Sequence, residues 1–323
     1  MSKYSVNIEK VAEAGDLEVI VLKGNGQEAR LLPAKGGNLC SYIVDGQELL
    51  QAPADLASGR GGFGFPVMFP YANRIVDATF TFEGTKYTII KNGQPKVLHG
   101  VVQDEAFAYS DLYADDDKAS ATVSIEIKPG TLLYTIYPFY LKLSLTYSIS
   151  NDGLKQDWCV ENLGTGNAPF GYGVHTYFGK IDDIEKTFLK VPTNTLMETD
   201  NCYPTRKKLD VQGTTYDLTE FVELGKLNLD NLYGDMSSKV ICEIEYRGVG
   251  RKTFLQASDN MKYMIVFSPP RNANGFCLEN QTNCTDGFNI LQEGKPRMAN
   301  VIVLPAGGKE TGWINVRHAY INK

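Results

Sequence analysis

The chain has 323 residues, of which 43% are hydrophobic and 22% are charged. These fractions are ordinary for a globular protein and exclude a disordered, collagen-like or coiled-coil chain. The net charge is −6 at pH 7, with 32 Lys and Arg against 38 Asp and Glu. A protein that binds nucleic acid usually carries a basic excess, so we expect no nucleic-acid partner.

The cysteines and the apolar segments exclude further classes of protein. Six Cys are too few for a disulfide scaffold, and they form no Cys-x-x-Cys or Cys/His cluster, so we expect neither disulfides nor a metal. The most apolar stretch, 132–145, contains Pro138 and Lys142 and is too short to cross a membrane. The first residues contain no apolar segment typical of a secretory signal. We therefore expect a cytoplasmic protein without a membrane partner.

Hydrophobic residues follow a period of two along most of the chain, which predicts strands. In chain order we expect strands over 17–22, 41–44, 47–50, 79–82, 85–90, 122–127, 141–149, 240–246, 263–267 and 301–304. Asp45-Gly46 and Glu83-Gly84 each separate two of these strands by two residues, which predicts two tight hairpins.

Helical periodicity is scarce. Residues 218–224 are the best candidate, with Asp217 as N-cap and Gly225 after the last turn, and a further short turn is expected near Leu56. Many strands with few helices predict an all-β protein, a large antiparallel β-sandwich rather than a βαβ nucleotide-binding fold. No linker or short repeat marks a boundary, so we expect one domain over 1–323.

The chain contains three histidines, His99, His175 and His318. Histidine titrates near neutral pH and is the commonest general acid or base, so each of them is a candidate. A hydrogen-bonded structural role is the alternative for each. We favour that structural role for His318, which lies in a strand-like stretch near the C-terminus.

Two further charged residues follow segments that are otherwise apolar or small. Glu279 ends the apolar run 276–278, where a carboxylate is costly to bury unless it is used or paired. Arg74 ends a loop rich in Gly, Pro and aromatic residues, a composition that often lines pockets. A salt bridge is the alternative for Glu279, and a structural tie to a sheet edge is the alternative for Arg74.

Several well-known catalytic patterns are absent. The sequence contains no Gly-x-Ser-x-Gly of a hydrolase, no His-Glu-x-x-His of a metalloprotease and no Gly-Lys-Ser/Thr of a phosphate-binding loop. These absences argue against a serine hydrolase, a zinc protease and a nucleotide-binding enzyme.

Seven short motifs occur in one order along the chain. They are Phe-Pro-x-x-x-Pro-x-x-Asn-Arg-Ile at 65–75, Phe-x-Phe-x-Gly-x-x-Tyr ending the segment 76–87, Leu-His-Gly at 98–100, His-x-Tyr-Phe at 175–178, Leu-Asp-Asn-Leu-Tyr at 229–233, Glu-x-Gln-Thr at 279–282 and Asp-Gly-Phe-Asn at 286–289. This ordered set resembles the aldose 1-epimerase (galactose mutarotase) family. The resemblance extends from about residue 30 to the C-terminus and implies the super-sandwich fold of that family.

The resemblance also implies roles for individual residues. His175 is expected to be the general acid that protonates the ring oxygen of a sugar, Glu279 the general base at the anomeric hydroxyl, and His99 a second donor near the ring oxygen. The residues expected to bind sugar hydroxyls are Arg74, Asn73 and Asp230. The implied substrate is a free monosaccharide such as glucose or galactose, and the implied protein acts without a cofactor or metal, as a monomer or a homodimer.

The implied reaction agrees with the residue types. Opening a cyclic hemiacetal requires one group to remove the O1 proton while another donates a proton to O5, and no redox step or metal is needed. A carboxylate and an imidazole are the smallest set that can do this, and they predict a bell-shaped pH dependence of kcat/KM.

Two other functions remain open. The first is a sugar-binding protein without turnover on the same fold, although binding alone does not require both His175 and Glu279. The second is a hexose-6-phosphate 1-epimerase, which needs a cationic clamp for a dianion. Arg74 and Arg271 are the candidates for that clamp.

Overall fold

The computed structural model describes residues 2–11, 16–53, 62–268 and 275–321. These residues form antiparallel sheets, which confirms the predicted all-β sandwich. One sheet has five strands, in the order β1 (Tyr4–Val11), β2 (Leu17–Gly24), β3 (Gln27–Leu32), β4 (Asn38–Val44) and β5 (Gln47–Glu48). It lies beside a seven-stranded sheet in the order β19 (Tyr203–Asp210), β18 (Thr195–Asp200), β21 (Leu229–Tyr233), β24 (Tyr263–Ser268), β25 (Gly275–Gln281), β16 (Gly173–Gly179) and β6 (Val67–Met68).

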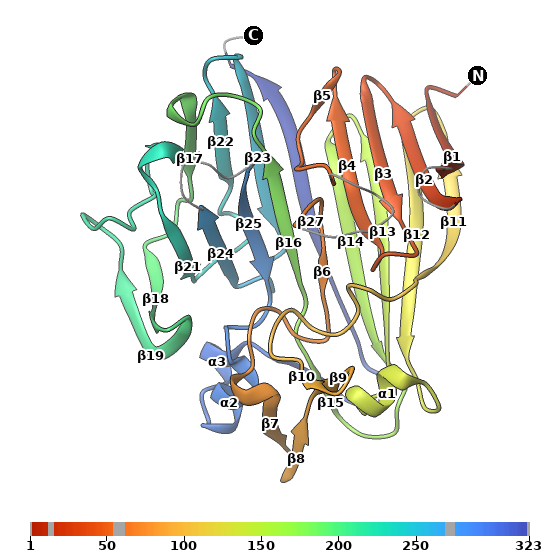
Figure 1. Ribbon diagram of the computed structural model, residues 1–323, viewed down its shortest axis with the longest axis vertical. Coiled ribbons are helices and arrows are strands. Elements are labelled where there is room, and N and C mark those ends of the chain that lie inside the picture. The colour runs from red at the N-terminus through yellow and green to blue at the C-terminus, as the bar shows by residue number, and fades with distance from the viewer. Residues whose placement is uncertain (1, 12–15, 54–61, 269–274, 322–323) are drawn as a thin grey trace.

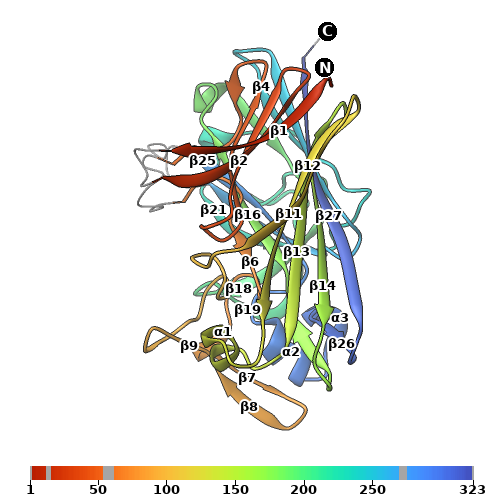
Figure 2. The ribbon, with the colours of Figure 1, turned by 90° about the vertical axis from the view of Figure 1, so that its right-hand side faces the viewer.

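A nine-stranded sheet forms the opposite layer, as the two perpendicular views show (Figure 1, Figure 2). Its strand order is β11 (Ala108–Ala114), β12 (Lys118–Ile127), β13 (Leu141–Ser150), β14 (Gly153–Asn162), β27 (Lys309–Tyr320), β23 (Arg251–Ala257), β22 (Cys242–Tyr246), β17 (Thr187–Lys190) and β20 (Val222–Glu223). Strands β2 and β3 pack against β12 and β13, so the two layers are in direct contact.

Small elements complete the described chain. Three two-stranded sheets pair β7 (Thr79–Phe82) with β8 (Thr85–Thr88), β9 (Ile90–Lys91) with β10 (Gln94–Pro95), and β15 (Ala168–Phe170) with β26 (Ile302–Leu304). The α-helices among the described residues are short: α1 (Leu132–Ile136), α2 (Gly287–Gln292) and α3 (Pro296–Ala299). No helix among the described residues is long and apolar enough to cross a membrane.

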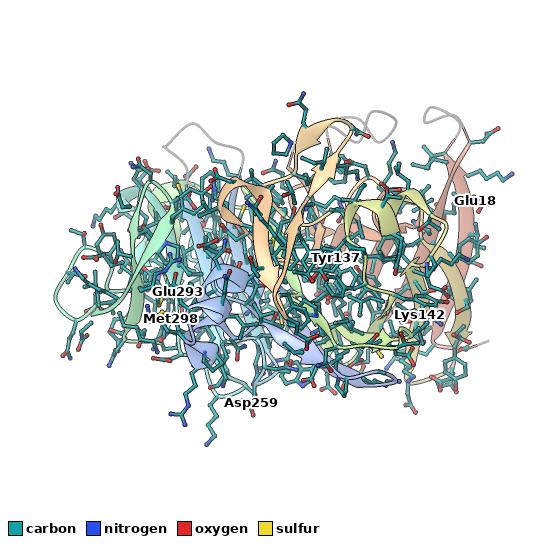
Figure 3. The ribbon with its side chains drawn as sticks, turned by 90° about the horizontal axis from the view of Figure 1, so that it is seen from below. Glu18, Tyr137, Lys142, Asp259, Glu293 and Met298 are labelled. Atoms are coloured by element: carbon teal, nitrogen blue, oxygen red, sulfur yellow. The ribbon has the colours of Figure 1, made fainter. Side chains whose placement is uncertain are left out.

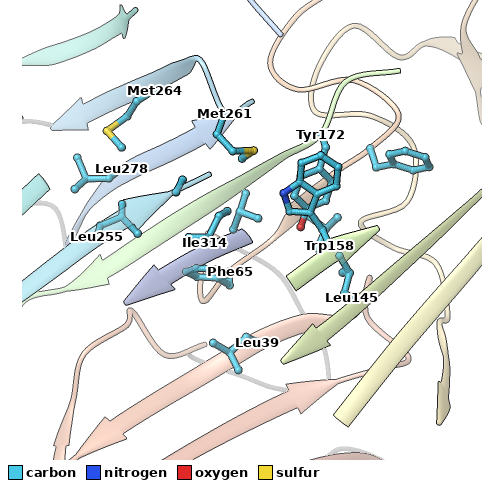
Figure 4. Packing of buried hydrophobic residues seen from close by; sticks show 14 of the residues in the cluster. Leu39, Phe65, Leu145, Trp158, Tyr172, Leu255, Met261, Met264, Leu278 and Ile314 are labelled. Atoms are coloured by element: carbon cyan, nitrogen blue, oxygen red, sulfur yellow. The ribbon is translucent and has the colours of Figure 1, made fainter. Parts of the chain in front are cut away.

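The core lies between the layers and is built from the inward face of each strand. Strand β13 alternates buried and half-buried residues along its whole length, so its Leu, Tyr and Ile side chains all point inward. Figure 4 shows Leu255 of the nine-stranded sheet next to Leu278 of the other layer, and both belong to the core. Seen from the end that carries the helices, Tyr137 lies in the interior, where its hydroxyl donates to the Pro169 carbonyl oxygen over 2.6 Å (Figure 3).

Most of the strands expected from the sequence are present, with longer or shifted ends. The two-residue turns at 45–46 and 83–84 join β4 to β5 and β7 to β8, and all four residues have the positive φ that such turns require. The expected strand over 85–90 is divided into β8 and β9. The turn expected near Leu56 lies outside the described residues, and the single domain over 1–323 stays a prediction.

The prediction of a helix over 218–224 is wrong. Asp217 does accept hydrogen bonds from the Thr219 backbone and hydroxyl, but the chain then extends. The Leu218 carbonyl oxygen accepts from Val191 N, and Val222 pairs with Leu189 as part of strand β20. Pairing with the exposed edge of β17 therefore replaced the two helical turns that the local pattern favoured.

Neighbouring residues of β13 provide a test of the layer assignment. We expect Leu143→Ala to lower the free energy of unfolding by about 2–5 kcal/mol, because its fully buried side chain would leave a cavity. Ser144→Ala, one residue along on the opposite face, is the control and should change it by less than about 0.5 kcal/mol. Chemical denaturation gives both values, and equal losses at the two positions would contradict the assignment.

Candidate active site

His175 and Glu279 lie side by side on neighbouring central strands of the seven-stranded sheet. Strands β16 and β25 are antiparallel, and their register places His175 directly opposite Glu279. Nε2 of His175 is 3.0 Å from Oε1 of Glu279. The two residues are only 8% and 3% exposed, so this pair is almost removed from water. The salt-bridge alternative considered for Glu279 is thus a contact with the other predicted catalytic residue.

The sheet register also explains which residues surround this pair. Directly paired residues in neighbouring strands point to the same face, so Leu232, Ile265, Glu279 and His175 form one row across β21, β24, β25 and β16. The next row on that face consists of Asp230, Phe267, Cys277 and Tyr177. The opposite face carries Leu278 and Val266, which belong to the core. On the site face Leu232 and Ile265 belong to a second, smaller hydrophobic cluster, so the polar groups lie beside buried apolar side chains.

His99 reaches the pair from a separate segment. Its ring meets the ring of His175 edge to face, with centroids 5.1 Å apart. Its backbone has φ +61, and its N–H donates to the Asn73 carbonyl oxygen over 2.8 Å. Single β-bridges join Phe69 to Gly100 and Arg74 to Leu98, so the segment 98–100 is held along the loop 69–74. The same contacts therefore position His99, Asn73 and Arg74 together.

The remaining predicted residues lie around the pair with opposite charges. Arg74 Nη1 donates to Asn73 Oδ1 over 3.2 Å, and the Arg74 carbonyl oxygen accepts from the Asp286 backbone. Asp230 is exposed on β21, in the row next to Glu279. Charge from Asp230 raises the pKa of Glu279 and charge from Arg74 lowers it, so both side chains act on the buried carboxyl group. The fold thus brings all six predicted site residues together.

Burial determines the protonation of the site. It lowers the pKa of His175 to about 4 and raises the pKa of Glu279 well above its usual range, in the second case with help from Asp230. The pKa of His99 is held well below its ordinary value, first by burial and then by the positive charges of His175, Arg74 and Lys96. Because both charged forms are disfavoured, the site favours a neutral His175 imidazole beside a protonated Glu279 carboxyl group, a pair with no net charge.

Buried polar atoms at the site have no partner among the described residues. They include Nδ1 of His99, Nδ1 of His175 and Oε2 of Glu279. A polar atom without a partner in a dry interior is costly, so three of them on neighbouring residues call for an explanation, and a bound ligand is one. These groups can donate or accept hydrogen bonds from several hydroxyls of one small polar molecule.

The same three residues have the composition of a small metal site. One ligand atom from each of His99, His175 and Glu279 lies within 4.8 Å of the others. However, Nε2 of His175 is already hydrogen-bonded to Oε1 of Glu279, and a cation would have to break that contact. The arrangement is therefore better suited to moving a proton than to binding a metal.

Other sequence candidates fall elsewhere. His318 lies on β27, where its Nε2 is 3.4 Å from Arg251 Nη1, away from the sheet that carries the site. Arg271 lies outside the described residues. Tyr177 was not predicted as a site residue. Its ring is stacked on that of His175. The two residues are two positions apart, and in a strand this spacing places both side chains on the same face, which is the signal that could have found it.

The fold and the site define an antiparallel β-sandwich with a buried acid–base pair on one sheet face. The family model described as aldose 1-epimerase matches residues 18–304. This match includes most of the chain and all six predicted site residues, so the chain belongs to the aldose 1-epimerase family, as the ordered motifs predicted.

Relatives and solved structures agree with this membership. Galactose mutarotase of Homo sapiens is 26% identical over 268 residues, which cover 72% of each chain. The uncharacterized protein YihR of Escherichia coli is 22% identical over 240 residues, or 71% of this chain and 75% of that protein. A galactose mutarotase-like protein of Clostridium acetobutylicum has a TM-score of 0.88 at 20% identity, covering 98% of this chain and 99% of that one. At this identity the structural likeness shows the fold.

Gly100 allows a test of how the His99 segment is positioned. Its φ is +68, and a Cβ there would lie 2.1 Å from the Phe69 carbonyl oxygen. We therefore expect Gly100→Ala to lower the free energy of unfolding by more than about 2 kcal/mol, which exceeds the usual cost of positive φ. Gly93→Ala is the control, because Gly93 has φ +74 with open space around it, and we expect about 1 kcal/mol. Equal losses in denaturation experiments would contradict the proposed close approach.

Proposed function

We propose that this protein is an aldose 1-epimerase that interconverts the α and β anomers of a free hexose such as glucose or galactose. The observation that carries the proposal is the buried contact between His175 and Glu279, with 3.0 Å between nitrogen and oxygen. The O1 and O5 atoms of a pyranose are both bonded to C1, so the two groups that serve them must lie close together. Membership of the family adds support, because relatives such as the human protein are named galactose mutarotases.

The reaction needs the one proton that the pair holds. Glu279 takes the proton from O1 while His175 gives its proton to O5, and the C1–O5 bond breaks to leave an open-chain aldehyde. Rotation about C1–C2 presents the other face of the carbonyl group. The ring then closes when O5 attacks C1. O5 returns its proton to His175, and Glu279 returns its proton to the aldehyde oxygen, which becomes the O1 hydroxyl again. Protons and bonds balance, and each positioned group contributes about 10²–10⁴-fold to the rate.

The ring-opening step connects two protonation states of the pair. Before opening, imidazolium faces carboxylate; after opening, neutral imidazole faces a carboxylic acid. These are two arrangements of the same single proton, so no proton has to come from solvent. Burial favours neutral imidazole beside the carboxylic acid, so a proton shift from Glu279 to His175 forms the imidazolium–carboxylate arrangement before the ring opens.

The other predicted residues surround this pair in supporting roles. His99 is a second donor for the ring oxygen, with its ring 5.1 Å from that of His175. Arg74, Asn73 and Asp230 are proposed to bind the hydroxyl groups of the sugar. The donors of Arg74, the acceptors of Asp230 and the amide of Asn73 suit a neutral polyol, which offers both donors and acceptors.

Replacing the proposed base tests the function directly. We expect Glu279→Gln to lower the rate of anomer exchange about 10²–10⁴-fold, because an amide cannot accept the O1 proton, while sugar binding is largely kept. Glu161→Gln, on the outward face of β14, is the matched control and should retain full activity. Polarimetry or saturation-transfer NMR on glucose and galactose measures exchange.

The same assay separates the two alternative functions. Exchange of glucose 6-phosphate in preference to glucose would support the phosphorylated substrate. Sugar binding without exchange by the unaltered protein would support a binding protein. Unchanged exchange in Glu279→Gln would refute the role of the base.

The pH dependence follows from the shifted pKa values. We expect a bell-shaped profile of kcat/KM whose acid limb lies near pH 4, because burial lowers the pKa of His175 to about 4 and a second proton enters the pair only there. On the alkaline side the pair loses its single proton, and the raised pKa of Glu279 moves that limb above the range of an ordinary glutamate. Initial rates on glucose give the profile, and an acid limb at the ordinary histidine value of 6.5 would contradict it.

A further inference from the structure

Tyr177 lies against the proposed acid. Its ring is stacked on the ring of His175, with centroids 4.3 Å apart and planes only 13° from parallel. The two residues are separated by one position in β16, so both side chains leave the strand on the same face. Face-to-face contact of this kind restricts how the imidazole ring can turn about its side-chain bonds.

Both the main chain and the ring of Tyr177 are held in place. The Tyr177 backbone N–H donates to the Gly64 carbonyl oxygen, and the Tyr177 carbonyl oxygen accepts from the Gln51 backbone N–H, both over 2.9 Å. A Cβ added at Gly62 would lie 2.3–2.5 Å from the outer ring atoms and hydroxyl of Tyr177, so the main chain passes directly over the ring edge. The tyrosine thus has little freedom to move away from His175.

We infer that Tyr177 is a positioning residue for the acid–base pair, which keeps the His175 ring plane aligned with Glu279 and stabilises the protonated imidazole. The aromatic face carries partial negative charge and attracts a cation more strongly than a neutral ring. This attraction opposes the effect of burial. The inference rests on the proposed function for its catalytic consequence, but the stacking itself acts on His175 whether or not the protein turns over a sugar.

The groups that face His175 must be included in any test of its titration. Glu279 faces it from β25 and His99 faces it from the 98–100 segment. Arg74 acts on both of these neighbours, and Asp230 acts on Glu279. Cys277 lies opposite Tyr177 on β25, and Tyr177 also interacts with Glu279. All of these side chains are kept when Tyr177 is replaced, and the Phe variant shows whether a change at His175 depends on the stacked ring.

Three variants separate the ring from the hydroxyl. Tyr177→Phe keeps the ring, whereas Tyr177→Leu removes it, and Tyr177→Met fills the space with a flexible chain if the leucine variant does not fold. Tyr87→Leu is the matched control, because Tyr87 is also half-buried and stacked, on Phe80 at 5.2 Å, outside the site. Thermal unfolding checks that each variant is folded.

NMR of the histidine rings provides a readout that does not depend on activity. The three histidines can be assigned with single His→Gln variants. We expect Tyr177→Leu to remove the upfield ring-current shift of His175 and to lower its pKa by about 0.5–1 pH unit, while Tyr177→Phe and Tyr87→Leu leave both unchanged. Unchanged His175 signals in Tyr177→Leu, or the same change in Tyr87→Leu, would overturn the inference.

Kinetics then test the catalytic consequence. In Tyr177→Leu we expect kcat to fall about 10-fold, KM to stay within about twofold, and the acid limb to move to lower pH together with the pKa of His175. A rise in KM at constant kcat would instead make Tyr177 a sugar contact. If the unaltered protein shows no exchange, the proposed function fails, yet the NMR result still decides whether Tyr177 positions His175.

Discussion

The contact between His175 and Glu279 is the constraint on which the site depends. Two ionisable side chains are held at hydrogen-bond distance in a nearly dry interior, where each alone would be costly to bury. They are tolerated because one proton serves both and leaves the pair uncharged. Nδ1 of His175 and Oε2 of Glu279 still have no partner among the described residues. The packing of the rest of the sandwich must therefore stabilise an incomplete polar network at this position.

The sandwich meets this requirement by giving the two faces of one sheet different tasks. Strands β16 and β25 are interior strands that pair with each other over seven residues, so neither can shift by one residue without turning core residues outward. Leu278 and Val174 belong to the core, and the alternate residues Glu279 and His175 are thereby fixed on the opposite face. Loops outside this sheet then add His99 and Arg74. Functional side chains are often placed in this way, on loops that a rigid sheet holds in position.

Individual residues show how far sequence reasoning reached. Most strands followed from alternation, and the ordered motifs contain all of the predicted site residues: His175, Glu279, His99, Arg74, Asn73 and Asp230. The helix over 218–224 failed because its capping residue and apolar spacing are local signals, whereas pairing with β17 is a long-range one. Tyr177 was visible within the motif at 175–178, but its stacking on His175 depends on how the chain near Gly62 passes over it.

The amino-acid sequence alone determined the type of fold and the chemical groups available, because alternation of apolar residues is a property of neighbouring positions and the histidines are few. Tertiary structure decided the distance between those groups and their protonation. Residues 175 and 279 are far apart along the chain, and only the antiparallel register of β16 and β25 brings their side chains into contact. Their pKa values follow from exclusion of water by the whole assembly, which no local stretch of sequence encodes.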